Sequence, residues 1–271
     1  MRGSRLRLSA GCLALLACAL APDGRGAEGF IPPGEERFKF NLGTLLYRSE
    51  TEVRIDGAQR GTSFELEDRL GLDDERTVLS ADFVWRFAPR HRLGLHVFQV
   101  KREEQRAIDE ELRIEDRVVP VNTVLRAESR MQFFVADYRY SFVKNPRMEL
   151  AGVVGVFGGR YRFSFEASNP QINIEKDVTA PVPVLGAALD WFITPRWTAS
   201  AFAQGMEFDL GEVDARVYNL GLSTEYMLTR HLGLGVAYNL DSVKVDVDKG
   251  SFHGRVDLSG GSLIGYLQAR F

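Results

Sequence analysis

Apolar and polar residues alternate along most of the chain from residue 38 to the C-terminus. In one clear example Leu79, Ala81, Phe83, Trp85 and Phe87 occupy every second position, with Ser80, Asp82 and Arg86 between them and Val84 as an exception. Residues i and i+2 lie on the same face of a strand, so this spacing predicts strands with one apolar side. The same pattern predicts ten such strands, over residues 38–48, 77–88, 92–101, 130–142, 148–162, 181–193, 197–208, 215–228, 232–242 and 260–271.

The connections between these strands alternate in length. Four of them are tight turns next to aromatic residues, in the stretches "WRFAPRHRLGLHV", "YSFVKNPRMEL", "WFITPRW" and "YMLTRHLGL". The other links are long and polar, over residues 49–76, 102–129, 163–180 and 243–259, and only 209–214 is short. Short turns at one end and long loops at the other are typical of transmembrane β-barrels.

A soluble β-sandwich also alternates apolar and polar residues, so the period alone does not decide between the two folds. Charged residues occupy the polar face, where a sandwich would expose them to water and a barrel would pair them across its lumen. The barrel interpretation therefore predicts a lumen charge network of Asp82, Arg86, Asp137, Arg139, Glu149, Asp190, Glu225 and Arg270.

Large aromatic residues favour the barrel. All three Trp residues lie on the apolar face within a few residues of a tight turn, where a sandwich core would place them at strand centres. Amphipathic rings prefer the head-group level of a membrane. We expect an aromatic girdle of Trp85, Phe87, Tyr140, Phe142, Trp191, Trp197, Tyr226 and Phe271.

The N-terminus has the features of an export signal. Three Arg residues precede a short apolar run, Leu8 to Leu16, and the small residues "ACALA" follow. We interpret residues 1–21 as a signal peptide, 22–37 as a flexible periplasmic leader, and 38–271 as the barrel. "LLAC" at residues 15–18 leaves lipidation of Cys18 as the alternative.

Export also changes the composition. Both Cys residues, Cys12 and Cys18, lie in the signal, so cleavage after Ala19 leaves no disulfide, thiol nucleophile or Cys-ligated metal. Losing three of the 34 Lys and Arg residues leaves 31 against 37 Asp and Glu, a net charge near −6. An acidic exported chain is a poor candidate for binding nucleic acid.

The chain ends in "LIGYLQARF", with terminal Phe271 following apolar residues at alternating positions. This resembles the C-terminal signature of bacterial outer-membrane β-barrel proteins. With the signal and the turns, the resemblance extends over the mature chain. It implies an all-β, antiparallel, up-and-down transmembrane barrel of about ten strands, with eight as the alternative, in the outer membrane of a Gram-negative bacterium. It also implies that Phe271 is the assembly signal read by the barrel assembly machinery.

Candidate chemistry is sparse. The acidic loop "FELEDRLGLDDERT", residues 64–77, could gather around Ca²⁺ but lacks EF-hand spacing, and we interpret it as a solvated loop. The mixed-charge run 101–117 fits two strands extending above the membrane better than a helix. No pair among the four His residues has metal-ligand spacing, and no nucleophile-elbow or phosphate-loop motif occurs.

We therefore expect a barrel with a structural or surface-interaction role, its lumen largely filled by charged side chains, with no catalytic, cofactor or metal site. The expected partners are outer-membrane lipid, lipopolysaccharide and the assembly machinery, and the expected state is a monomer. A narrow porin-like channel is the first alternative. A barrel enzyme acting at its rim, through Asp241, Asp246 or His253, is the second.

Overall fold

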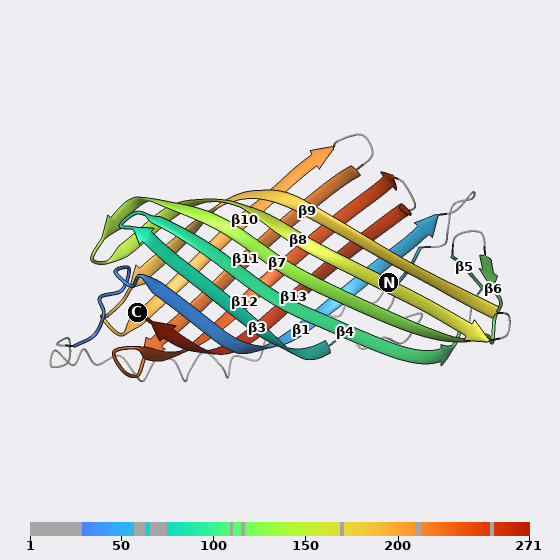
Figure 1. Cartoon of the computed structure of the whole chain (residues 1–271), viewed down its shortest axis with the longest axis horizontal. Coiled ribbons are helices and arrows are strands. Elements are labelled where there is room, and N and C mark those ends of the chain that lie inside the picture. Colours follow the sequence, from blue (N-terminus) through green and yellow to red (C-terminus); the bar gives the residue numbers. More distant parts are fainter. Residues whose placement is uncertain are drawn as a thin grey trace, which may run out of the picture.

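The computed structural model describes residues 29–56, 63–65, 75–108, 111–114, 117–168, 171–209, 213–249 and 252–271. Within these residues, strands β1 and β13 pair from Lys39↔Arg270 to Asp56↔His253 and close an antiparallel ring (Figure 1). The ring consists of ten strands: β1 (Phe38–Asp56), β3 (Glu75–Ala88), β4 (His91–Ala107), β7 (Val124–Asn145), β8 (Met148–Ser168), β9 (Gln171–Phe192), β10 (Trp197–Asp209), β11 (Val213–Met227), β12 (Leu232–Lys249) and β13 (Phe252–Arg270). The short strands β2 (Phe64–Glu65), β5 (Leu112–Ile114) and β6 (Arg117–Val119) lie in the connections.

The all-β barrel of ten strands expected from the sequence is confirmed, and the eight-stranded alternative is wrong. Two of the expected long loops are also wrong: residues 163–180 and 243–259 are mostly strand, as are both ends of 102–129. Charged residues cover the outward face of these extensions, so the segments have the composition of loops while keeping the period of strands. The expected signal peptide lies outside the described residues, which contain no helix long and apolar enough to cross a membrane.

Three of the four tight turns are closed by a side-chain oxygen at their first residue. Asn145 Oδ1 accepts hydrogen bonds from the backbone N–H groups two and three residues later, at 2.8 and 3.0 Å. Thr194 Oγ1 does the same at 3.2 and 3.0 Å, and Thr229 Oγ1 at 3.3 and 3.0 Å. Such local bonds are the reason that Asn and Thr favour turns. We call the end with these turns the periplasmic end, because outer-membrane barrels have short turns on that side.

Partway along the barrel the outward face of the strands changes from apolar to charged, and the inward face changes from charged to apolar. Toward the periplasmic end of β7, Phe134 and Tyr140 are exposed on the outer wall and Asp137 is buried inside. Farther along the same strand Arg126 is exposed outside, while Met131 is buried inside. Side chains still alternate at every second residue, so the exchange reflects the surroundings: a lipid-facing band gives way to a water-facing wall.

Two seams divide the ring above this band. Pairing of β3 with β4 ends at Ser80↔Phe98, and pairing of β9 with β10 ends at Leu185↔Gly205. On β9 the reason is visible in the sequence. Pro183 and Pro181 lie just beyond Leu185 on the way from the periplasmic end to the head, and the pairing of β9 with β8 continues past both. Proline has no N–H to donate, so it occurs in strands on a side that lacks a ladder partner.

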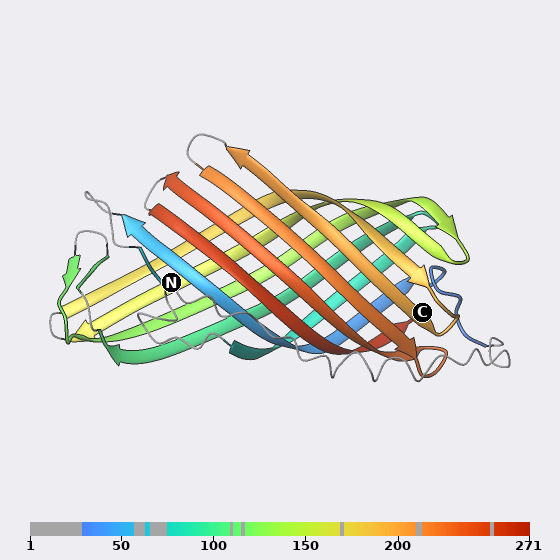
Figure 2. The ribbon, with the colours of Figure 1, turned by 180° about the vertical axis from the view of Figure 1, so that it is seen from behind.

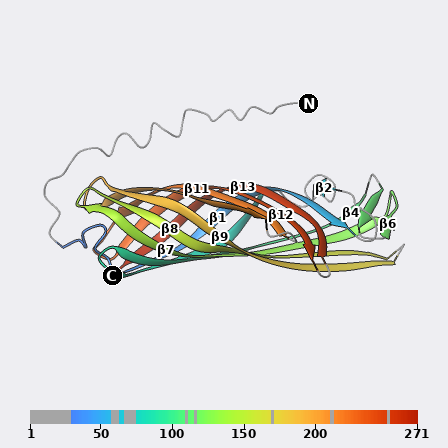
Figure 3. The ribbon, with the colours of Figure 1, turned by 90° about the horizontal axis from the view of Figure 1, so that it is seen from above.

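Beyond the seams the wall forms two sheets, which run in different directions away from the periplasmic turns (Figure 2). We call the outer parts of β4, β7, β8 and β9 the first head sheet, and those of β1, β3, β10, β11, β12 and β13 the second. Seen from above, the molecule is strongly flattened (Figure 3). The inner faces of both sheets contribute to one apolar cluster, which includes Phe133, Phe163, Phe165 and Val182 from the first sheet and Val53, Val217, Val245 and Leu258 from the second. We call the two sheets with this core the extracellular head.

Candidate functional site

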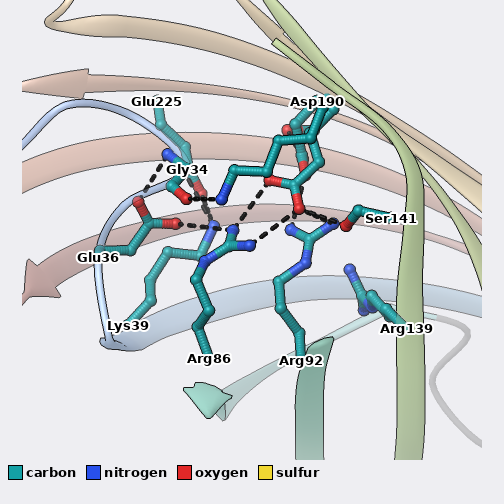
Figure 4. A network of polar contacts seen from close by, with 12 residues as sticks. Gly34, Glu36, Lys39, Arg86, Arg92, Arg139, Ser141, Asp190 and Glu225 are labelled. Atoms are coloured by element: carbon teal, nitrogen blue, oxygen red, sulfur yellow. Dashed lines mark hydrogen bonds and ion pairs between the residues drawn. The ribbon is translucent and has the colours of Figure 1, made fainter. Parts of the chain in front are cut away.

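Charged side chains fill the periplasmic part of the lumen (Figure 4). Seven of the eight residues expected in the lumen network lie here: Arg86, Asp137, Arg139, Glu149, Asp190, Glu225 and Arg270. The eighth, Asp82, lies farther along β3 and bonds to His96 Nδ1. Alternation within the strands brings them together, since each occupies an inward position with an outward apolar or aromatic residue on at least one side.

Glu149 is the centre of this network and is fully buried. Arg86 donates hydrogen bonds from Nη1 and Nη2 to the two carboxylate oxygens of Glu149, both at 2.9 Å. The Ser141 hydroxyl donates a further bond to Oε1, and Arg92 Nη2 lies 3.6 Å from the same atom. The carboxylate therefore holds two guanidinium groups and one hydroxyl around a single buried charge.

Two further carboxylates continue the network around the ring. Glu225 is 3.0 Å from Lys39 Nζ and 2.9 Å from Arg270 Nη2, and it accepts a 3.0 Å bond from the Tyr266 hydroxyl. Because Glu225 belongs to β11 and its partners to β1 and β13, the ion pairs connect strands on both sides of the ring closure.

Asp190 of β9 is the third carboxylate. It is 2.7 Å from Arg92 Nη1 and accepts a 2.7 Å bond from the Ser200 hydroxyl. Arg92 thus joins Asp190 to Glu149. Arg92 and Lys39 were not predicted to belong to the network. Arg92 follows the first turn directly and resembles a solvated turn residue, but β4 begins at His91, which places the next residue inside.

The N-terminal segment, residues 29–37, lies across the periplasmic mouth. Lys144 Nζ donates to the carbonyl oxygens of Gly34 and Pro89, at 2.7 and 2.8 Å. Gly34 has a positive φ of 82°, and a Cβ there would lie 3.0 Å from the Phe192 ring, so glycine suits this close approach. The Arg196 guanidinium carbon lies 4.3 Å from the centre of the Phe30 ring. The boundary between leader and barrel at residue 37 stays a prediction. Residues 29–37 of the expected leader contact the barrel.

Between this segment and the ion pairs a cavity of only about 20 Å³ remains, lined by Glu36, Arg92, Thr198 and Glu225 among others. That volume is enough for about one water molecule. Farther along the lumen a second cavity of about 60 Å³ is lined by polar and aromatic groups, including His96, Asn219, Asp241, Phe98 and Phe133.

The structure places all eight expected girdle aromatics near the periplasmic turns and on the outer wall. Six of them belong to the exposed large apolar side chains of the protein: Phe87, Tyr140, Phe142, Trp191, Tyr226 and Phe271. Trp197 is half-buried and donates from Nε1 to Thr224 Oγ1 at 2.7 Å. Phe271 also closes the ring, since its carbonyl oxygen accepts bonds from the N–H groups of Arg37 and Phe38 at 2.6 and 2.9 Å.

The two candidate rim carboxylates that the structure describes, Asp241 and Asp246, do not converge. Asp241 lies inside, where it accepts a 2.5 Å bond from Asn219 Nδ2, whereas Asp246 pairs with Arg255 at 2.7 Å on the outer wall. The side chain of His253 and most of the acidic loop 64–77 lie outside the described residues. Among the side chains that the structure describes, no group of three His, Cys, Asp or Glu residues could hold a metal ion.

No family model and no curated protein matches the chain by sequence. Solved structures do match its fold. The outer membrane protease OmpT from Escherichia coli aligns with a TM-score of 0.58 at 10% identity, over 91% of this chain and 100% of that one. Ail, the attachment invasion locus protein of Yersinia pestis, aligns with a TM-score of 0.38 at 13% identity, over 87% and 99% of the two chains. The outer membrane protein OprG from Pseudomonas aeruginosa aligns with a TM-score of 0.37 at 12% identity, over 86% and 95%.

The first of these likenesses extends over nearly the whole chain at the level of the fold. It agrees with a closed ring of ten antiparallel strands whose outer wall carries an apolar band and aromatic rings. The chain is a β-barrel with the fold of the bacterial outer-membrane proteins.

Proposed function

We propose that the protein is a non-enzymatic, non-conducting barrel of the bacterial outer membrane, whose extracellular head presents a surface for interaction. The observation that carries this proposal is that the described lumen is filled at both ends. Charged side chains and the N-terminal segment fill the periplasmic end. Apolar side chains fill the head.

At the periplasmic end the cations and anions pair across the lumen and leave no continuous passage. A conducting pore would need a hydrated path, but Glu149, Arg86, Arg92 and Arg270 are each at least nine-tenths buried. Lys144 attaches the N-terminal segment over them through two backbone carbonyls. Removing that segment alone would therefore uncover the ion pairs without opening a channel.

In the head the packing is that of a sandwich core. Phe163, Phe165 and Val217 are almost completely buried between the two sheets. An ion entering such a region would lose its water without gaining a partner, which costs on the order of tens of kcal/mol in an apolar medium. The head is thus the second barrier to conduction.

The outer faces of the head carry charged ladders. Arg160 lies 2.6 Å from Asp177, Lys244 lies 2.6 Å from Asp257, and Arg255 lies 2.7 Å from Asp246. Paired charges of both signs on long, rigid hairpins give a hydrated surface that can form specific polar contacts. Outer-membrane lipid and lipopolysaccharide remain the proposed surroundings of the barrel, a monomer remains the proposed state, and Phe271 remains the proposed assembly signal.

Planar-bilayer recording of the purified protein tests the proposal. We expect no unitary current steps from the wild-type protein. Deletion of residues 29–37, and separately the substitution Phe163→Ser, should each leave the protein silent, because the other barrier remains. The two changes together should also leave the protein silent, because the ion pairs of Glu149 and Glu225 still fill the periplasmic lumen. Heat-modifiable migration checks that each variant is folded. Ion-selective steps from the wild-type protein would refute the proposal.

A further inference from the structure

The seam between β3 and β4 leaves an unpaired strand edge at the upper limit of the apolar band. The last pair is Ser80↔Phe98, yet β4 continues to Ala107 and pairs there only with β7. On the other side of the seam β3 pairs with β1 as far as Glu75. Between these two edges the described backbone has no ladder hydrogen bonds.

An outer groove of about 650 Å³ lies at this seam. Its lower part is apolar and belongs to the lipid-facing wall, with Leu42, Leu79, Val97 and Phe134 among its lining residues. Its upper end is polar, formed by Gln99, Gln132, Thr179 and Arg160. The groove thus crosses the level at which the outer wall changes from apolar to charged, the head-group level of the outer leaflet.

Three residues whose side chains face inward also contribute to the lining of this outer groove: Ser80, Phe98 and Phe133. Ser80 and Phe133 are only 3% and 4% exposed, so little of their surface is open to the groove. Phe98 and Phe133 line the interior cavity of about 60 Å³ as well. Their rings stack at a centroid distance of 4.7 Å with an interplanar angle of 21°. This aromatic pair therefore lies in the part of the wall between the groove and the lumen.

We propose that the seam is a lateral binding site for a single-chain amphiphile that enters from the outer leaflet. Its acyl chain would lie along Leu42, Leu79 and Val97, with its end against the Phe98–Phe133 pair. The volume lies within the roughly 300–1,000 Å³ that is usual for sites holding one small molecule. Continuity with the lipid-facing band gives such a molecule direct access from the membrane.

The polar end of the groove favours a hydrogen-bonding head group. Gln132 Nε2 donates to Gln99 Oε1 at 2.7 Å, and amide side chains have further donors and acceptors beyond one such bond. Arg160 is held by Asp177 through bonds of 2.6 and 3.1 Å, so its charge is balanced on the protein. The head group of the amphiphile therefore meets amides and a neutralised guanidinium, which suits a carboxylic acid or an alcohol.

Photolabelling tests this site. The protein is reconstituted into phospholipid bilayers that contain palmitic acid with a diazirine at its terminal carbon, then irradiated, digested and mapped by mass spectrometry. The matched wall is that of β11 and β12, where Leu222 and Leu234 are 64% and 47% exposed to lipid. We expect labelling around Val97, Phe98 and Phe133 to exceed that of the matched wall about tenfold, the ratio given by about 1.4 kcal/mol of preferential binding.

Two controls make the result decisive. Ala81→Trp places a large ring in the groove and should abolish the preference, whereas Ala203→Trp, at an outward-facing alanine of β10, should leave it unchanged. A diacyl phospholipid with the same diazirine should label all walls alike, because two chains exceed the groove. Uniform labelling by the fatty acid, or equal preference of the phospholipid for the seam, would overturn the proposal and show ordinary lipid contact.

Discussion

Replacing Glu149 with glutamine should destabilise the barrel more than any other single change of charge in the lumen network. The substitution keeps the size of the side chain and removes the charge between Arg86 and Arg92. Both guanidinium groups are more than nine-tenths buried, so water cannot replace the lost partner. The variant therefore leaves the Arg86 and Arg92 guanidinium groups buried without the negative charge of Glu149 between them.

The magnitude follows from the remaining contacts. Removing one partner from a buried ion pair usually costs about 3–5 kcal/mol. Arg86 keeps a 3.0 Å bond to the Pro89 carbonyl and lies 3.8 Å from Glu36, and Arg92 keeps Asp190 at 2.7 Å. These partners reduce the loss, so we expect a decrease in the free energy of unfolding near the lower limit, about 3 kcal/mol.

Urea unfolding in phospholipid vesicles measures this quantity, with fluorescence of the three outer-wall Trp residues as the signal. Glu207→Gln is the matched control, since Glu207 pairs with Arg216 in the exposed head and such pairs contribute little in water. Arg86→Met combined with Glu149→Gln should cost clearly less than the sum of the two single changes, because the two side chains interact directly. A loss for Glu149→Gln no greater than for the control would refute the reasoning.

Three further expectations concern the head and the orientation. Phe163→Ala should lower the free energy of unfolding by about 3–5 kcal/mol, since it creates a cavity at a side chain that is 1% exposed, and the same urea titration measures it. The bonds from Arg160 lower the pKa of Asp177 in the head, so its contribution to stability is present at neutral pH and is lost as the pH falls through that lowered pKa. Asp177→Asn should accordingly differ from wild type at pH 7 and converge with it in acid, as followed by unfolding across a pH series. A cysteine at Asn122 should react with an impermeant maleimide on intact cells and one at Arg147 should not; the reverse pattern would invert the topology.

The alternation of residues was sufficient to predict the ring. In most strands the apolar stripe facing lipid was long enough to identify which central side chains point inward, and so Glu149, Glu225 and Arg270 could be assigned to the lumen before their partners were known. The tight turns could also be located, because a Pro or a basic pair interrupts the alternation there. Their closure by Asn145, Thr194 and Thr229 was detectable in the sequence as an Asn or Thr at the first turn position.

The tops of the strands could not be predicted in the same way. Above the band, residues such as Arg126 and Arg162 face water, and the apolar side of the strand faces another sheet. The period of two persists, but the inversion makes each segment resemble a charged loop. Lys39 and Arg92 were missed because each lies within two residues of a strand end, where a single position of alternation decides its direction. The positions of the seams depend on where hydrogen bonding between neighbouring strands ends. In the sequence only Pro181 and Pro183 of β9 indicate such an end.

The inversion of the strand faces also fixes the height of the barrel in the bilayer. Four arginines, Arg126, Arg130, Arg160 and Arg162, lie on the outer faces of β7 and β8 beyond the apolar band. Moving a single Arg to the bilayer midplane on a barrel wall costs about 2–4 kcal/mol, so drawing all four back through lipid would cost roughly 8–16 kcal/mol. The hairpins of the head must therefore cross the membrane shielded from lipid. Once they have crossed, the cost of moving the arginines through lipid prevents the barrel from moving back toward the periplasm.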